Sequence, residues 1–181
     1  SIDGMSKAPS VFDYEKLAWF NGEYLRAKTP EEFTEIAMPY YQQVFGDTQV
    51  DWAVLTSILQ PRVVRLTDIP GMIGFLKELP EYDKELFINK KSKANLDNAP
   101  VMLKAAIEAL TALPEWNVTA IHDCLIGLAQ QLEVKNGTLL WPVRIAAAGM
   151  QVTPGGAMEI LAILGKEESL RRLELGLAKL S

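Results

Sequence analysis

The stretch Gly137–Arg172, GTLLWPVRIAAAGMQVTPGGAMEILAILGKEESLRR, carries the strongest structural signal in this chain of 181 residues. Between Lys135 and Glu159 the only ionisable side chain is Arg144, which stands between two apolar residues. A buried charge without a partner destabilises a fold by several kcal/mol. We therefore expect Arg144 to reach solvent, to pair with a distant carboxylate, or to face an anionic ligand. A core helix with one solvent-reaching arginine is an equally open interpretation.

The sequence Thr153-Pro154-Gly155-Gly156 predicts a tight turn before a further helix. A proline at the start of a helix, preceded by a threonine that can cap it, leaves backbone N–H groups free at that end. Such groups suit an anion or the edge of a base. The sequence therefore places an arginine and a helix N-terminus one turn apart on an apolar surface.

Helical signals extend along nearly the whole chain. The sequence Thr29-Pro30-Glu31-Glu32 predicts a capping box with proline in the first helical turn. Asn117 predicts another cap, and we expect its helix to end at Lys135-Asn136-Gly137. The apolar residues of that helix recur at the spacing of one helix face: Val118, Ile121, Leu125, Leu128 and Leu132. Because no segment alternates convincingly as a strand does, the predicted fold class is all-α with no significant sheet.

Charge and periodicity change along the chain and indicate two helical subdomains in tandem. The segment Leu79–Asn98 is charged and weakly periodic, so we place a boundary near its start. We expect residues 1–12 to lead in as a linker or a remnant of cloning, with the remnant confined to Ser1–Met5. Residues 13–79 then form the first subdomain and residues 80–181 the C-terminal one.

Composition limits the classes of function. The net charge of −5 argues against a protein that coats nucleic acid generally, although it permits a local basic face. The single cysteine, Cys124, excludes an internal disulfide and suits a reducing cytoplasm. No signal peptide and no run of roughly 18 apolar residues is present, so we expect a cytoplasmic protein that does not enter a membrane.

No group of residues in the sequence indicates catalysis. His122 is the single histidine, and Cys124 two residues later points to another face of a helix. One histidine and one cysteine are too few to hold zinc, so no metal site is predicted. The Thr153–Gly156 turn lacks the lysine and the preceding strand of a phosphate-binding loop. The tripeptide Met5-Ser6-Lys7 matches part of a known enzyme signature, and we interpret this match as chance.

Three segments together resemble one family. Residues 141–174, WPVRIAAAGMQVTPGGAMEILAILGKEESLRRLE, resemble the C-terminal end of bacterial glutamyl-tRNA synthetases. Residues 6–26, SKAPSVFDYEKLAWFNGEYLR, resemble the segment that leads into the anticodon-binding region of that family, and residues 59–70, LQPRVVRLTDIP, resemble a further stretch of it. The segments keep the order and spacing of the family, and the resemblance covers essentially the whole chain.

The resemblance implies an all-helical module that binds the anticodon loop and stem of glutamate tRNA, not DNA, as a monomer. In that family an N-terminal Rossmann-type domain handles ATP, Mg²⁺, glutamate and the acceptor end of the tRNA. This chain does not contain that domain, so we expect no cofactor in it and no aminoacylation by it alone. Sequence-specific RNA recognition targets splayed loop bases, which need few protein groups.

The resemblance also implies which residues bind. Arg62 falls where a discriminating synthetase places an arginine against the third anticodon base. Arg144 and the turn of Thr153, Pro154 and Gly155 fall where the last subdomain contacts the first two bases. Gly156 departs from the larger apolar residue of many relatives, which weakens a stacking role there. Further expected tRNA contacts are Arg65, Lys16, Asn21, Lys90, Lys91 and Lys93.

The roles of some residues, and an alternative function, stay open at this point. The lysines between residues 90 and 93 also fit a solvated loop. Leu17, Trp19 and Phe20 are expected in the core. The alternative function is a helical scaffold that binds another protein through a surface bearing Trp19, Trp141 and Met150. Arg144 favours RNA over that alternative, because a protein groove gains little from one charge in an apolar surface.

Overall fold

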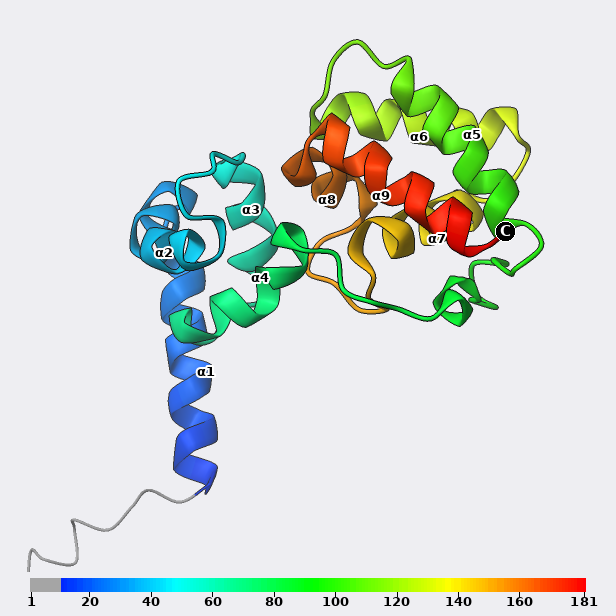
Figure 1. Ribbon diagram of the computed structural model, residues 1–181. Coiled ribbons are helices and arrows are strands. Elements are labelled where there is room, and N and C mark those ends of the chain that lie inside the picture. Colours follow the sequence, from blue (N-terminus) through cyan, green and yellow to red (C-terminus); the bar gives the residue numbers. More distant parts are fainter. Residues whose placement is uncertain (1–10) are drawn as a thin grey trace, which may run out of the picture.

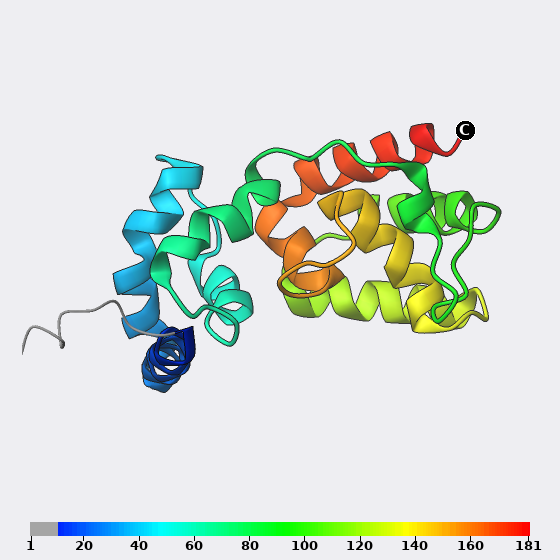
Figure 2. The same ribbon diagram turned by 90° about the horizontal axis from the view of Figure 1, so that it is seen from below.

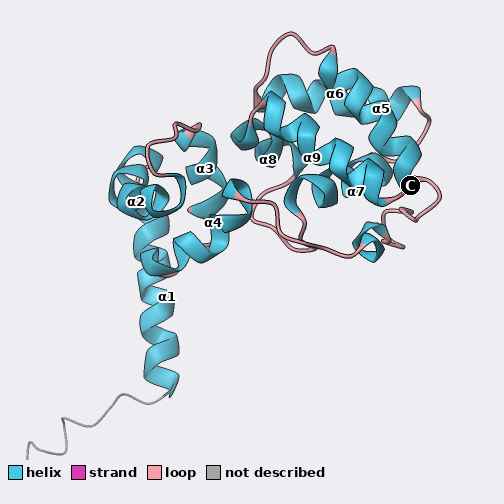
Figure 3. Ribbon diagram, viewed as in Figure 1, coloured by secondary structure: helices cyan, strands magenta, loops and turns pink. Residues whose placement is uncertain are grey.

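A computed structural model describes residues 11–181 of the chain, and within this range nine α-helices account for the fold, without a strand (Figures 1 and 3). The prediction of an all-α fold is confirmed. The interpretation of Met5–Lys7 lies outside the described residues. In chain order the helices are α1 (Val11–Ala27), α2 (Pro30–Phe45), α3 (Trp52–Leu59), α4 (Ile69–Lys77), α5 (Ala99–Thr111), α6 (Val118–Gln131), α7 (Asn136–Ala148), α8 (Ala157–Leu164) and α9 (Lys166–Lys179).

The helices gather into two groups. Helices α2, α3 and α4 pack together above the C-terminal end of α1, and α5 to α9 form the second group (Figure 1). Helices α3 and α4 meet α8 across the junction, and Figure 2 shows the two groups side by side. The division of the chain near residue 79 into two subdomains stays a prediction.

Local signals fix α2. The Thr29 hydroxyl accepts the Glu32 N–H at 3.1 Å, and a Glu32 carboxylate oxygen accepts the Thr29 N–H at 2.9 Å, so the predicted capping box is confirmed. Pro39 lies inside the helix without ending it. One face of α2 supplies the core of the first group, and the Tyr41 hydroxyl lies 2.8 Å from that of Thr56 on α3.

The connection between α6 and α7 differs from the prediction. Asn117 caps α6 as expected, since its side chain accepts the Ala120 N–H at 2.8 Å. The helix then stops at Gln131, and the left-handed residue of the turn is Glu133 with φ 57°. Gly137 lies in the first turn of α7, where an added Cβ would come within 3.3 Å of the Ser92 hydroxyl. Gly137 therefore permits a close approach between two segments and does not end a helix.

Helix α7 occupies the centre of the second group. It packs against α5, α6, α8 and α9, and the small residues Ala146, Ala147 and Ala148 are fully buried between them. Small side chains let neighbouring helices approach closely, which suits an element with neighbours on several sides. Arg144 is half-buried on this helix and lines a hollow at its surface.

Three residues expected in the core lie outside it. The exposed fractions of Leu17, Trp19 and Phe20 are 60%, 59% and 52%. All three lie on the part of α1 that extends away from the other helices (Figure 1). The prediction that these residues are buried is wrong, because nothing among the described residues packs against this part of α1.

Candidate nucleic-acid interface

A shallow groove crosses the junction between the two groups of helices. Its volume is about 290 Å³, and residues from both groups line it: Arg62, Gly71, Met72, Met150, Val152, Thr153 and Pro154. The structure therefore brings Arg62 to the same groove as Thr153 and Pro154, as the predicted site requires, although some 90 residues separate them in the sequence. Arg144 stands behind the turn that forms one wall.

The loop that carries Arg62 is held from the side of α1. The Gln60 side-chain amide donates to the Leu25 and Lys28 carbonyls at 3.0 and 2.8 Å. The Asn21 amide donates to the Val64 carbonyl. Arg62 itself is exposed, and it donates to the Ile58 carbonyl at 2.8 Å. Among the described residues it forms no ion pair, so most of its donors face solvent at the groove.

Arg144 is half-buried and keeps part of its guanidinium at the surface, but it forms no ion pair with a carboxylate among the described residues. Its guanidinium donates to the Thr153 hydroxyl at 3.1 Å and to the Gln151 carbonyl at 2.8 Å, with a longer contact of 3.5 Å to the Met150 carbonyl. It lies 4.9 Å from the centre of the Trp141 ring. Burial lowers the pKa of Arg144. Backbone carbonyls and a hydroxyl thus replace the expected carboxylate, and Arg144 holds the groove wall in place.

The Thr153–Gly156 turn is built differently from the prediction. Gly156, three residues after the expected cap, is the N-cap of α8, and its N–H is taken by the Glu159 carboxylate at 2.9 Å. The Thr153 hydroxyl instead donates to the Gly155 carbonyl at 3.0 Å and accepts from Arg144. Pro154 is buried and does not start the helix, because α8 begins only at Ala157. The expected capping by Thr153 is wrong, and one of the backbone donors expected to be free is already occupied.

Gly155 fixes the turn against the other group of helices. Its φ is +73°, a conformation that residues with a side chain rarely adopt. An added Cβ would lie 2.5 Å from the Ile58 Cγ2 atom on α3. The absence of a side chain at this position therefore lets the turn contact α3 at Ile58, four residues before Arg62.

The groove offers both polar and apolar chemistry. The side chain of Val152 is 83% exposed, and Met72 and Met150 are half-buried beside it. Apolar and thioether groups can pack on the face of a base, while the Arg62 guanidinium can donate to its edge. A second hollow of about 260 Å³ is lined by Arg144 and Trp141, together with Ser92 and Ala157.

The further expected contacts fall into two places outside the groove. Arg65 and Asn21 line another hollow of about 390 Å³ beside Tyr24 and Lys28. The Asn21 amide is already bound to a backbone carbonyl, as described above. Lys16 is exposed on α1, with its ammonium 6.0 Å from the centre of the Phe20 ring. The structure does not bring these residues to the Arg62 groove.

The three lysines occupy a tight turn closed by the pairing of Asn89 with Ala94. Lys90, Lys91 and Lys93 are exposed, and Lys93 has a φ of 56°. The same turn contributes Ser92 to the hollow beside Arg144. The lysines therefore flank that hollow and lie apart from the Arg62 groove.

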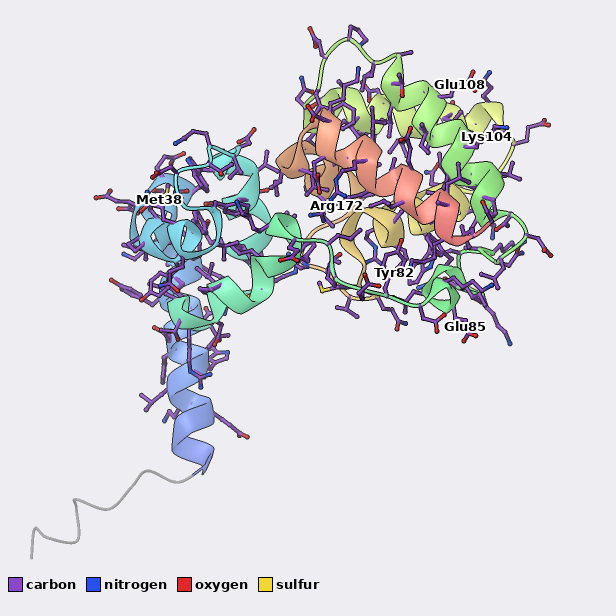
Figure 4. The ribbon with its side chains drawn as sticks, viewed as in Figure 1. Met38, Tyr82, Glu85, Lys104, Glu108 and Arg172 are labelled. Carbon is purple, nitrogen blue, oxygen red and sulfur yellow. The ribbon has the colours of Figure 1, made fainter. Side chains whose placement is uncertain are left out.

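Sequence reasoning missed the residue that holds the junction closed. Arg172, labelled in Figure 4, has no exposed surface. It donates to the carbonyls of Phe75 and Ala147 at 2.8 Å each and to that of Leu76 at 3.4 Å. These carbonyls belong to the C-terminal ends of α4 and α7. Arg172 also donates to the Glu168 carboxylate at 2.7 Å. The sequence signal was the adjacent pair of arginines, of which only one turns inward.

Glu168 joins both arginines. Its carboxylate also accepts two hydrogen bonds from the exposed Arg171, at 2.8 and 2.7 Å. Hydrogen bonds from Arg171 and Arg172 lower the pKa of Glu168 to about 2. The carboxylate therefore stays charged wherever the chain is folded near neutral pH, and it compensates the buried guanidinium.

The described residues do not form a recognisable catalytic or metal-binding group. His122 is exposed beside Asp123, and burial raises the pKa of the half-buried Cys124 thiol. Within residues 11–181 no set of histidine, cysteine and acidic side chains is grouped so as to hold a metal ion. No helix in this part of the chain has the length and apolar character needed to cross a membrane.

The residues offered for a protein-binding surface are dispersed. Trp141 and Met150 line two different hollows. Trp19 lies on α1, which belongs to neither. The three residues therefore do not form one continuous apolar surface of the kind that protein partners use.

Comparison with known proteins gives a consistent result. A family described as "Anticodon binding domain" matches residues 25–177. The chain is 44% identical over 176 residues to glutamate–tRNA ligases of Clostridium tetani and of Clostridium kluyveri, which covers 97% of this chain and 36% of each ligase. The chain thus spans about a third of the length of these relatives.

A solved structure shares the fold. The crystal structure of a glutamate tRNA ligase from Elizabethkingia meningosepticum, in complex with its amino acid, superposes with a TM-score of 0.74 at 23% identity. The match covers 92% of this chain and 32% of that one. With the family match extending over most of its length, the chain belongs to the anticodon binding domain family.

Proposed function

We propose that this chain is the anticodon-binding region of a glutamate–tRNA ligase and that it binds the anticodon loop of glutamate tRNA. The support is the 44% identity to clostridial ligases over nearly the whole chain and the family match over residues 25–177. Joining glutamate to tRNA with ATP and Mg²⁺ is then the task of parts of the ligase beyond this chain. The region acts as a monomer in the cytoplasm, a compartment that its single free cysteine fits.

The observation that carries this proposal is the groove assembled from both groups of helices. It places one exposed guanidinium, that of Arg62, opposite the apolar wall of Met150 and Val152. A base turned out of a loop needs a donor at its edge and an apolar surface at its face. The groove supplies both without a basic surface overall, which agrees with a net charge of −5.

Each predicted residue then has a distinct task. Arg62 reads the edge of the third anticodon base with the donors that its bond to Ile58 leaves free. Arg144 keeps the turn of Thr153, Pro154 and Gly155 in the shape that receives the first two bases. Contacts to phosphates set the register of the RNA but carry no sequence information. The turn of Lys90, Lys91 and Lys93 makes such contacts, and Lys16, Asn21 and Arg65 make them with the stem.

A titration with a labelled anticodon stem-loop of glutamate tRNA tests the proposal. We expect Arg62→Ala to weaken binding by about 1–3 kcal/mol, which is the range for one specific contact. Arg144→Ala should weaken binding as well, because the turn loses the side chain that holds it. Arg171→Ala is the matched control, because Arg171 is exposed on α9 and paired with Glu168 away from the groove. Affinity should fall steeply as salt rises.

The same titration distinguishes specific from general binding. Changing the third anticodon base should weaken binding to the native chain, and Arg62→Ala should remove that difference. Equal binding of the stem-loop and an unrelated hairpin, both by this chain and by a full-length ligase that contains it, would overturn the proposal. Binding to a protein that salt does not weaken, with no binding to RNA, would favour the scaffold instead.

A further inference from the structure

Arg62 lies in the loop between α3 and α4, and the backbone around it follows a defined path. The N–H groups of Arg62 and Val63 both donate to the Leu59 carbonyl at 2.9 Å. Val63 is 1% exposed, so the residue that follows Arg62 is packed into the core. The Arg62 guanidinium donates in turn to the Ile58 carbonyl at 2.8 Å. The position of this loop therefore decides where the remaining donors of Arg62 can reach.

Gln60 ties the loop to the end of α1. Its side-chain amide donates to the Leu25 carbonyl at 3.0 Å and to the Lys28 carbonyl at 2.8 Å, which lie 35 and 32 residues away in the sequence. Both carbonyls are at the C-terminal end of α1, where helix carbonyls lack their usual partners. A glutamine amide carries two N–H donors, so Gln60 uses both of them on α1.

A second amide holds the other side of the loop. The Asn21 side chain on α1 donates to the Val64 carbonyl, two residues after Arg62. Arg62 is thus the midpoint of a segment whose two ends, Gln60 and Val64, are bound to the same helix. Asn21 and Leu25 are four residues apart, so the two attachments lie along one face of α1. Helix α1 therefore supports the loop at two points.

The fold does not depend on Gln60 alone. Leu25 is 3% exposed and belongs to the hydrophobic core, and Gly22 one turn earlier is buried too. At the end of α3, Ile58 is 3% exposed and Leu59 has no exposed surface. Removing the Gln60 amide should therefore loosen the loop while the helices that it joins stay packed.

Reading a base requires more than a cation nearby. A guanidinium discriminates between bases only when its donors face the correct atoms of the base edge, whereas many positions suffice to attract a phosphate. A loop that could shift would let Arg62 follow a wrong base or turn to the backbone of the RNA. Fixing the loop in advance removes these alternatives and the entropy lost on ordering it during binding.

We propose that Gln60 is a positioning residue that sets the specificity of the anticodon-binding region at the third base, by holding the Arg62 loop on α1. This inference rests on the proposed function, since it takes Arg62 to read that base. Gln60 acts through Arg62 and not on the RNA, because both of its donors are used on α1 and it does not line the groove.

Third-base discrimination tests the proposal. The affinities for the anticodon stem-loop of glutamate tRNA and for one with a changed third base are measured in this chain and in a full-length ligase that contains it. Gln60→Met keeps the length of the side chain and removes its donors. We expect it to lower the ratio of the two affinities by about tenfold, within the discrimination that one good contact to a base provides. The affinity for the changed stem-loop should stay near that of the native protein.

Two comparisons separate positioning from general stability. Thr34→Val is the matched control, because the Thr34 hydroxyl on α2 lies 2.6 Å from that of Thr56 and neither residue belongs to the loop. It should leave the ratio unchanged. In an Arg62→Ala background, Gln60→Met should not change the ratio further, because no guanidinium is left to place. Circular dichroism establishes that each variant is folded, and Gln60→Asn, whose amide is one carbon shorter, replaces Gln60→Met if that variant is not.

Two results would overturn the proposal. A native ratio in the Gln60 variant, even with an equal loss of affinity for both stem-loops, would leave Gln60 a structural role only. A further fall of the ratio in the Arg62→Ala background would show that Gln60 does not act through Arg62. Failure of the proposed function looks different, because the native chain and the full-length ligase would then bind both stem-loops and an unrelated hairpin equally.

Discussion

The junction between the two groups of helices has a closed side and an open side, and each depends on one arginine. On the closed side Arg172 has no exposed surface and makes four hydrogen bonds to protein acceptors. On the open side Arg62 is exposed and binds one carbonyl, that of Ile58. The same side chain thus closes the structure in one place and remains available to a ligand in the other.

This difference shows that the partners of a charge decide its task. The carbonyls at the ends of α4 and α7 have no acceptor role left within their own helices, and a cation there is favoured by the helix dipoles. Arg172 satisfies both ends at once and so sets the angle between the groups. The groove around Arg62 then exists because that angle is fixed. The closed side gives the open side its shape.

The largest effect should follow from removing the buried guanidinium. We expect Arg172→Met to lower the free energy of unfolding by about 3–5 kcal/mol, because it leaves two buried helix ends without their donor. Urea denaturation followed by circular dichroism measures the change. Arg171→Met, which removes the exposed neighbour, should cost about 1 kcal/mol or less. Similar losses of unfolding free energy for the two variants would show that Arg172 has no special role in closing the junction.

A smaller loss should follow from Gly155→Ala at the groove wall. The new Cβ combines a φ of +73° with a clash against Ile58, so we expect a loss of about 1–3 kcal/mol in stability and weaker stem-loop binding. Gly127→Ala is the control, since nothing lies within 4 Å of its added Cβ, and it should be neutral or stabilising. If both alanine variants bind RNA as the native chain does, the wall does not contribute to the site.

Acid should weaken the closed side through Glu168. Its pKa of about 2 in the folded chain lies below the ordinary value of 4.5. The stability that this shift provides is fully present above about pH 4.5 and is lost as the pH falls toward 2. We expect Glu168→Gln to be less stable than the native chain at pH 7 and the difference to shrink across that window. A difference that stays constant from pH 7 to pH 3 would be the contrary result.

The smallest effect on stability should come from the open side. Arg62→Ala should change the free energy of unfolding by no more than about 0.5 kcal/mol, since the residue is exposed and makes one bond to backbone. Its effect on stem-loop binding should be far larger, as described above. Thermal unfolding of the variants used in the titration provides the measurement. If Arg62→Ala is clearly destabilised, Arg62 has a structural role like that of Arg172.

Local signals were sufficient for much of the fold. The capping box at Thr29 and the cap at Asn117 formed as predicted, because each depends on residues three positions apart in the chain. The predictions for Gly137 and Thr153 were wrong, because each position is decided by a contact with another segment: the turn that holds Ser92 in one case and the Arg144 side chain of α7 in the other. Short-range rules cannot describe such contacts.

The sequence by itself determined an all-α chain, its family resemblance and the residues to test for RNA binding. Only the tertiary structure decided that Arg172 is buried between the ends of α4 and α7 while Arg171 beside it is exposed. It also decided that Arg62 shares a groove with Thr153 and Pro154. It also showed that Phe20 and its neighbours are uncovered. The physical reason is that helix formation follows local spacing, whereas burial depends on which distant segments arrive to provide partners and to exclude water.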